Sequence, residues 1–232
     1  MGRVLVRALQ GTGVLVAVLD LPASLAQNPP PPEVLTVAMD GSDAASVDAA
    51  FATLAGQWPQ LDGFVNLAGF FKGFLPVAQL PVDTFDETIA GNLRCHFLCA
   101  RAALPLLHKS GKGALVSVAS TMAVDVVKNY THYGMAKAGI VAMVKGLARE
   151  NAPRVRVNAV APGLTNTAFL TGGTGRAQIF EGIREELYAK RVPMQRMAQA
   201  EDMAGPILFL LGNASAFVNG EMLIVDGGVY TQ

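Results

Sequence analysis

Short runs of apolar, β-branched residues alternate along this chain with longer stretches in which apolar residues recur every three or four positions. The short runs predict strands that are buried on both faces, and the longer stretches predict helices packed against those strands. Strands are expected at Val14–Leu19, Val34–Ala38, Gly63–Asn66, Gly113–Val118, Arg154–Val160 and Glu221–Val225, and helices at Ala45–Trp58, Pro81–His108, Tyr130–Asn151 and Ala200–Leu211. This alternation predicts an α/β fold with a doubly wound, Rossmann-like parallel sheet flanked by helices.

The composition fits a single domain over residues 1–232, because 51% of the residues are hydrophobic and can fill one large core. Charged residues make up only 16% and the net charge is zero, which argues against a nucleic-acid partner or an anionic membrane surface. No segment approaches the roughly 20 apolar residues of a membrane span. Cys95 and Cys99 are too few for a disulfide framework and lack the further ligands of a metal site, so we expect thiols in the core or at a subunit contact.

The first thirty residues have some features of a secretion signal, namely Arg3, Arg7 and an apolar run. That run ends after six residues at Asp20, and the same residues fit a helix, a glycine turn and a strand. We therefore expect a cytoplasmic protein.

Two segments interrupt the alternation. Pro29–Pro32 predicts a stiff surface loop. The excursion from Thr165 to Met197 begins rich in Thr and Gly and then shows a helical pattern around Phe180–Lys190. Residues 167–197 are therefore a candidate substrate lid.

Tyr133 and Lys137 are four residues apart in a predicted helix, so their side chains share one face. A nearby cation favours the phenolate, and we expect it to lower the pKa of Tyr133. A tyrosine tuned in this way can exchange a proton with a substrate oxygen.

Further motifs stand at fixed distances from this pair. Ser120 lies thirteen residues before Tyr133, and Asn92 lies 28 residues before Ser120. Three segments follow predicted strands: Asn66-Leu67-Ala68-Gly69, Ala161-Pro162-Gly163 and Val225-Asp226-Gly227-Gly228. With these motifs the chain resembles the short-chain dehydrogenase/reductase family from Gly2 to Gly228.

The resemblance implies a catalytic role for four residues. Ser120 would hydrogen-bond the substrate oxygen, and Tyr133 would transfer the proton. Lys137 would lower the pKa of the tyrosine and bind the nicotinamide ribose, while Asn92 would complete a proton path through a water molecule. The three histidines, His96, His108 and His132, have no part in this scheme, although His132 is close enough to Tyr133 to touch a substrate.

The resemblance also implies a nicotinamide cofactor. An acidic residue after the second strand of such folds binds the ribose hydroxyls and repels a 2′-phosphate, so Asp20 favours NAD(H) over NADP(H). The expected cofactor-binding residues are Asp20, Leu21, Asp40, Gly41, Asn66, Ala68, Gly69, Tyr133, Lys137, Pro162, Gly163, Thr165 and Thr167.

One part of the family pattern is not found. The family begins with a strand followed by Thr-Gly-x-x-x-Gly-x-Gly, and Gly2 aligns with the last of these glycines. We therefore expect the first strand and most of the phosphate loop to be absent from this chain, which would leave two strand edges uncovered. Gly11 and Gly13 do not replace the loop, because they fall between a helix and a strand.

Two interpretations follow. The first is an NAD(H)-dependent enzyme that interconverts a secondary alcohol and a ketone, with the start of its sequence missing. The second is a shortened, non-catalytic homologue that acts as a structural or oligomer partner and binds cofactor weakly. For the enzyme, substrates from a 3-oxoacyl thioester to a steroid, a sugar-derived ketone or a small secondary alcohol remain open. Phe169, Phe180 and Leu187 suggest a partly apolar pocket, and the family habit suggests a homotetramer or homodimer.

Overall fold

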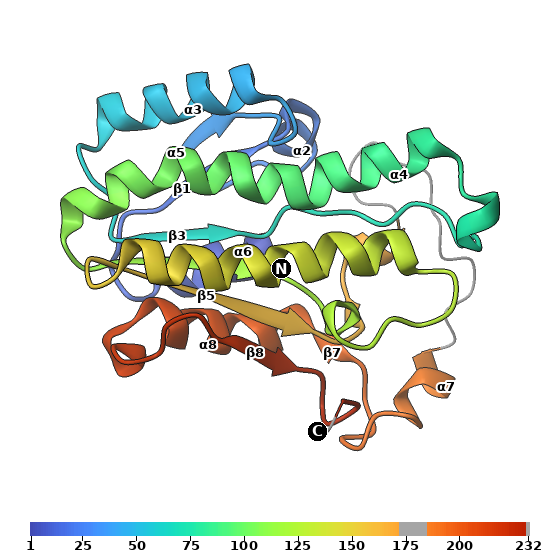
Figure 1. The fold of residues 1–232 in the computed structure, drawn as a ribbon. Helices are drawn as coiled ribbons and strands as arrows, with labels where there is room; N and C mark the ends of the chain where they lie inside the picture. The colour runs from blue at the N-terminus through green and yellow to red at the C-terminus, as the bar shows by residue number, and fades with distance from the viewer. Residues whose placement is uncertain (172–184, 231–232) are drawn as a thin grey trace.

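The parallel β-sheet predicted from the sequence is found in the computed structural model, which describes residues 1–171 and 185–230. Helices lie on both faces of the sheet (Figure 1). The main strands are β1 (Ala17–Asp20), β2 (Leu35–Ala38), β3 (Gly63–Asn66), β4 (Gly113–Val118), β5 (Val155–Pro162) and β8 (Met222–Val225). The main helices are α1 (Gly2–Gln10), α2 (Pro22–Gln27), α3 (Ala44–Gln57), α4 (Val82–Ile89), α5 (Cys95–Ser110), α6 (Thr131–Asn151), α7 (Glu185–Ala189) and α8 (Ala200–Leu211).

The parallel strands form two separate ladders. One ladder pairs β1 with β2, and the other has the order β3-β4-β5-β8. Within the described residues no ladder joins β1 to β3, so each has an edge without a strand partner. The two uncovered strand edges expected from the sequence are therefore confirmed. A third, short parallel pair joins β6 (Thr165–Asn166) to β7 (Ala198–Gln199).

Two apolar clusters fix the helices to the sheet. Residues of α3, α5 and α6 pack on one face, in a cluster that includes the free thiols Cys95 and Cys99. On the other face, Leu5 of α1 packs with Ile207 of α8 against Val116 and Val160 of the central strands. The core position expected for the two cysteines is confirmed.

Most predicted elements match the structure within a few residues, but the predicted helix Pro81–His108 is interrupted. Between α4 and α5 the chain makes a π-helical turn over Ala90–Arg94. Inside this turn the side chain of Asn92 donates hydrogen bonds to the carbonyls of Thr88 and Phe70, both at 2.9 Å. A side chain that enters the carbonyl ladder is a recognised reason for a helix to widen locally.

The N-terminal third shows two smaller differences. The strand predicted at Val14–Leu19 begins only at Ala17, because Val14 and Leu15 are 49% and 80% exposed and precede the ladder with β2. The helix α2, which was not predicted, forms just before the proline run.

The candidate lid, residues 167–197, lies partly outside the described residues. Of the helical piece expected around Phe180–Lys190, the described part contains α7, and Phe180 falls on residues that are not described. In Figure 1, α7 lies on the side of the sheet to which the arrows of β5 and β8 point. Among the described helices, none is both long and apolar enough to cross a membrane.

Candidate active site

The four residues expected to be catalytic come from three elements that meet at the carboxyl ends of the strands. Ser120 lies two residues beyond β4 and caps a short 3-10 turn, where its Oγ accepts a hydrogen bond from the amide of Met122 at 3.2 Å. Tyr133 and Lys137 occupy the first two turns of α6, and Asn92 lies in the π-helical turn. Tyr133, Lys137 and Asn92 are all buried.

Tyr133 lies beside Ser120, but its electrostatics differ from the expectation. Burial of the phenol raises the pKa of Tyr133 above its ordinary value, and the interaction with the Ser120 hydroxyl acts in the opposite direction without offsetting it. The lowering expected from Lys137 is therefore wrong for the protein's own residues. The reason is geometric: the Lys137 ammonium lies 5.6 Å from the centroid of the Tyr133 ring and donates a hydrogen bond elsewhere.

Lys137 is held in the interior at the end of β4. Its side chain is 3% exposed, and Nζ donates to the carbonyl of Val118 at 3.0 Å. Burial lowers the pKa of Lys137 to about 8, while the nearby thiol of Cys95 acts in the opposite direction. The lysine is thus mostly cationic at pH 7 and close to the range in which it would release its proton.

Asn92 leaves one polar atom unused beside the glycine segment. Its Nδ2 makes the two carbonyl hydrogen bonds of the π-helical turn, but its Oδ1 is buried without a partner in the described part of the chain. A Cβ placed on Gly69 would lie 2.7 Å from this oxygen and 3.2 Å from Nζ of Lys137. Asn92 and Lys137 therefore converge on Gly69.

The segment from Asn66 to Gly69 is fixed by hydrogen bonds to its backbone. Asn66 Oδ1 accepts a hydrogen bond from the amide of Ala68 at 3.0 Å. Nε2 of His96 lies 3.0 Å from the carbonyl of Ala68, and since a carbonyl only accepts, this nitrogen is the donor. Burial lowers the pKa of His96 to about 3, which keeps the ring neutral at pH 7. His96 is therefore structural, as the sequence predicted.

The segment that follows β5 is hydrogen-bonded to the Val225-Asp226-Gly227-Gly228 motif near the C-terminus. The amide of Gly163 donates to the carbonyl of Val225 at 3.1 Å, and a Cβ on Gly163 would lie 2.8 Å from Cβ of Asp226. Thr165 is buried and its hydroxyl donates to the carbonyl of Gly163 at 3.1 Å. Pro162 ends β5, and Thr167 is half-buried two residues beyond Thr165.

The residues expected to bind the adenosine end of the cofactor lie at the ends of β1 and β2, which form the two-stranded ladder. Asp20 ends β1 and is exposed, and its Oδ1 accepts a hydrogen bond from the amide of Leu21 at 2.7 Å. Asp40 follows β2 and accepts hydrogen bonds from the amide and hydroxyl of Ser42. A Cβ on Gly41 would lie 2.4 Å from Sγ of Cys95, so α5 links this end to the catalytic end.

Aromatic rings surround Tyr133, and most of them were not predicted from the sequence. The ring of Phe71 meets that of Tyr133 edge-on at 5.6 Å and stacks on that of Tyr130 at 4.5 Å. The Phe70-Phe71-x-x-Phe74 pattern after Gly69 was the available signal. His132 is buried, and its Nε2 lies 2.8 Å from the carbonyl of Lys72, which gives it a structural contact.

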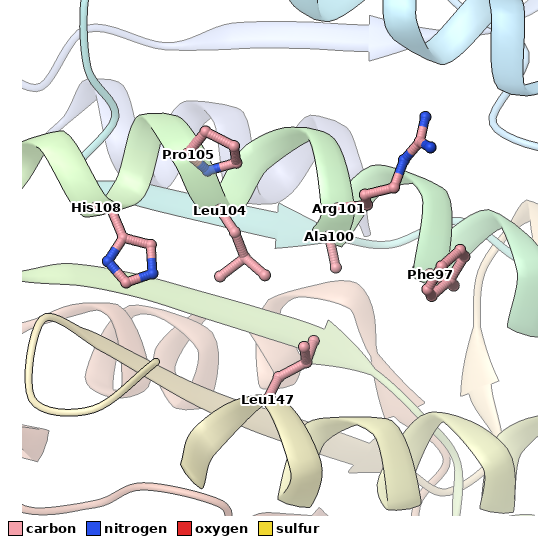
Figure 2. A pocket seen from close by; sticks show the side chains of 7 residues that line it. All are labelled: Phe97, Ala100, Arg101, Leu104, Pro105, His108 and Leu147. Atoms are coloured by element: carbon pink, nitrogen blue, oxygen red, sulfur yellow. The ribbon is translucent and has the colours of Figure 1, made fainter. Parts of the chain in front are cut away.

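A shallow apolar groove lies on the outer side of α5 and α6, away from the catalytic residues (Figure 2). Phe97 stands at one end of the groove and His108 at the other, and Leu147 of α6 faces them. The groove is lined by Phe97, Ala100, Arg101, Leu104, Pro105, His108 and Leu147. Within the described ranges, no group of three or more His, Cys, Asp or Glu side chains is arranged to hold a metal ion.

Comparison with known proteins agrees with this geometry. A family model described as enoyl-(acyl carrier protein) reductase matches residues 1–230. The D-threitol dehydrogenase of Mycolicibacterium smegmatis is 35% identical over 192 residues, which cover 82% of this chain and 71% of that protein. The cis-4-hydroxycyclohexanecarboxylate dehydrogenase of Sinomonas cyclohexanicum is 34% identical over 195 residues, 84% of this chain and 76% of that protein. A crystal structure of a short-chain dehydrogenase/reductase (glucose/ribitol dehydrogenase) from Brucella melitensis matches 100% of this chain and 92% of its own, with a TM-score of 0.88 and 28% identity.

Proposed function

The chain belongs to the short-chain dehydrogenase/reductase family of oxidoreductases acting on CH–OH groups, and we propose that this member interconverts a secondary alcohol and a ketone with NAD(H). The observation that carries the proposal is the convergence of Asn92 and Lys137 on Gly69, with the ring of Tyr133 5.6 Å from the lysine ammonium. When bound, the nicotinamide supplies or accepts the hydride.

The buried residues near Gly69 fit such a cofactor. The unpartnered Oδ1 of Asn92 and the lysine ammonium border a glycine that has no side chain to block a close approach. Lys137 would hold the nicotinamide ribose, and the segments Asn66–Gly69 and Pro162–Thr167 would supply backbone contacts to the nicotinamide end.

Side chains of the protein would exchange the proton with the substrate oxygen. Ser120 would donate a hydrogen bond to the substrate oxygen, and the Tyr133 hydroxyl would exchange a proton with that oxygen. Because burial raises the pKa of Tyr133, the phenol is protonated at neutral pH and is in the state required to donate to a developing alkoxide. Alcohol oxidation needs the phenolate instead, so the proton of Tyr133 must leave before the alcohol can give up its own.

Asp20 supports NAD(H) as the cofactor. Its carboxylate is exposed at the end of β1, where it can accept hydrogen bonds from ribose hydroxyls and would repel a 2′-phosphate.

Two measurements on this 232-residue chain test the proposal. Titration with NADH should show saturable binding, and a ketone should cause oxidation of NADH, seen as loss of its absorbance. Tyr133→Phe should abolish turnover and leave NADH binding within about twofold, because it removes one hydroxyl and keeps the ring. Turnover by Tyr133→Phe at the wild-type rate would refute the role given to Tyr133.

A second candidate function is the non-catalytic oligomer partner. It is favoured by the edges of β1 and β3, which have no strand partner in the described residues. A well-folded protein, by circular dichroism, with neither NADH binding nor ketone-dependent turnover would favour this candidate over the enzyme.

We also propose self-association and a cytoplasmic location. The apolar groove of α5 and α6, with the half-exposed ring of Phe97, supports a contact between copies of the chain. The free thiols Cys95 and Cys99 suit a reducing compartment.

A further inference from the structure

The ring of Tyr133 is part of a continuous aromatic cluster, defined here as Phe71, Phe74, Tyr130 and Phe169 around Tyr133. Phe71 contacts three of these rings, with distances measured between ring centroids: Tyr133 edge-on at 5.6 Å, Tyr130 stacked at 4.5 Å and Phe74 edge-on at 4.9 Å. The rings of Phe74 and Tyr130 also meet edge-on at 4.7 Å, and the ring of Phe169 lies 6.2 Å from that of Tyr133 in a tilted arrangement. Such distances are those of interacting aromatic pairs.

The rings of the cluster come from three separate segments of the chain that meet at Tyr133. Phe71 and Phe74 come from the segment after Gly69, Tyr130 precedes α6, and Phe169 lies in the 3-10 turn Ala168–Thr171. Phe71 is only 3% exposed and therefore supports the other rings from within. Phe74 is 39% exposed, and Tyr130 and Phe169 are partly exposed, so these three present ring surface near Tyr133.

The surface of the cluster consists mainly of aromatic carbon and is uncharged at neutral pH. Burial raises the pKa of Tyr130 to about 12, so its phenol stays neutral. Lys72, which lies between Phe71 and Phe74 in the sequence, is paired with Glu87 at 2.7 Å. The nearby Nε2 of His132 lies against a backbone carbonyl. A substrate with many hydroxyl groups would lose water there without gaining matching hydrogen bonds.

We propose that the aromatic cluster is the surface that contacts the substrate, an inference that rests on the proposed function. The cluster would favour a secondary alcohol or ketone whose oxygen is attached to an apolar ring, and it would disfavour a polyol. A flat or chair-shaped hydrocarbon ring can lay its C–H groups on the faces of Phe74, Tyr130 and Phe169 while its oxygen reaches Tyr133 and Ser120. Each buried methylene is worth about fourfold in affinity, so a cyclohexyl ring placed against the cluster gains well over tenfold.

Direct binding tests the proposal without requiring turnover. Ligand-observed NMR with cyclohexanone should show saturable binding to the wild-type chain. Phe74→Ser and Phe169→Ser change partly exposed rings, and each should weaken cyclohexanone binding at least about fivefold. The matched control is Phe217→Ser, because Phe217 is fully exposed and outside the cluster; it should bind as the wild type does. Absence of cyclohexanone binding, or equal binding by all four proteins, would overturn the proposal.

Steady-state kinetics with three alcohols then distinguish the effect of substrate polarity on kcat/KM from the effect of substrate shape. Cyclohexanol and inositol share a six-membered carbon ring and differ in their hydroxyl groups, whereas hexan-2-ol keeps the carbon number without the ring. We expect kcat/KM for cyclohexanol to exceed that for inositol at least about 100-fold and that for hexan-2-ol several-fold. Phe169→Ser should raise KM for cyclohexanol with little change in kcat, the pattern of lost ground-state binding.

The two proposals fail in different ways. If inositol is turned over as well as cyclohexanol, the selection for apolar rings is refuted and the dehydrogenase function stands. If cyclohexanone binds through Phe74 and Phe169 but no alcohol or ketone is turned over, the ring-binding surface stands and the proposed function is refuted.

Discussion

The side-chain oxygen of Asn92 and the ammonium of Lys137 both lie against the position that a Cβ would occupy on Gly69. A Cβ at this position would lie 2.7 Å from Asn92 Oδ1 and 3.2 Å from Lys137 Nζ, and the backbone has a positive φ of 153°. Since side chains with a Cβ rarely adopt such backbone angles, both the space and the conformation require glycine. The lack of a side chain at Gly69 thus allows Asn92 of the π-helical turn and Lys137 of α6 to approach the backbone of this segment.

Gly69→Ala should therefore damage both stability and cofactor binding. Overpacking and backbone strain each cost about 1–3 kcal/mol, so we expect the free energy of unfolding to fall by about 2–6 kcal/mol. NADH binding should weaken at least tenfold, because Asn92 and Lys137 are displaced. Urea denaturation and NADH titration measure the two effects.

Gly56→Ala provides the control. Gly56 lies in the last turn of α3, and a Cβ there would meet nothing within 4 Å. Alanine is the better helix former, so this variant should be more stable than the wild type by about 0.5–1 kcal/mol and should bind NADH normally. If both alanine variants behave alike, the convergence at Gly69 has no functional meaning.

The buried ammonium of Lys137 makes stability depend on pH. Its pKa is lowered to about 8 from 10.5, so between these values the unfolded chain holds a proton that the folded protein has released. The unfolded state then binds more protons, and the contribution of Lys137 to stability rises with pH across this window. Below pH 8 both states are protonated, and the folded protein carries the full penalty, on the order of 3 kcal/mol.

Lys137→Met should remove that penalty. After allowing about 1 kcal/mol for the lost hydrogen bond to Val118, we expect the variant to be more stable than the wild type by about 2 kcal/mol at pH 7. The advantage should shrink as the pH rises from 8 to about 10.5. Lys145→Met, at an exposed position on the same helix, should show no such trend. An advantage that grows over this pH range in urea denaturation would contradict the assignment.

The sequence predicted the parts of this protein that depend on local pattern. The apolar runs at Gly63–Asn66 and Gly113–Val118 match β3 and β4 residue for residue. The signal is clearest for β4, which is buried throughout and therefore reads as a continuous apolar run. The four-residue spacing of Tyr133 and Lys137 predicted that these side chains share one face of a helix, and in α6 the lysine ammonium lies 5.6 Å from the centroid of the tyrosine ring.

Features that depend on tertiary surroundings could not be predicted in the same way. The pKa of Tyr133 is set by how completely neighbouring segments cover the phenol, and that burial outweighs the charge expected to lower it. The π-helical turn depends on Asn92 finding the carbonyl of Phe70, which is 22 residues away in the sequence. The aromatic cluster needs rings from three segments, so no single stretch of sequence revealed it.

Cofactor preference should respond to Asp20. Its carboxylate is exposed at the end of β1, where we propose that the adenosine ribose binds, and like-charge contact with a 2′-phosphate is strongly unfavourable. Asp20→Ser should raise the ratio of kcat/KM for NADPH to that for NADH at least tenfold. Asp86→Ser, an equal change of charge at an exposed position on α4, should leave the ratio unchanged. Steady-state rates with both cofactors measure it, and an unchanged ratio in Asp20→Ser would remove the support for NAD(H).

The groove of α5 and α6 should carry the contact between copies of the chain. Phe97 is 54% exposed at one end of the groove, so a charge there would have to be buried in any assembly that uses this face. We expect light scattering to give a dimer or tetramer for the wild type and mostly monomer for Phe97→Asp. Val82→Asp is the control, because Val82 is 71% exposed at the start of α4, where a negative charge suits the helix dipole. If Phe97→Asp keeps the mass of the wild type, the groove is not the contact.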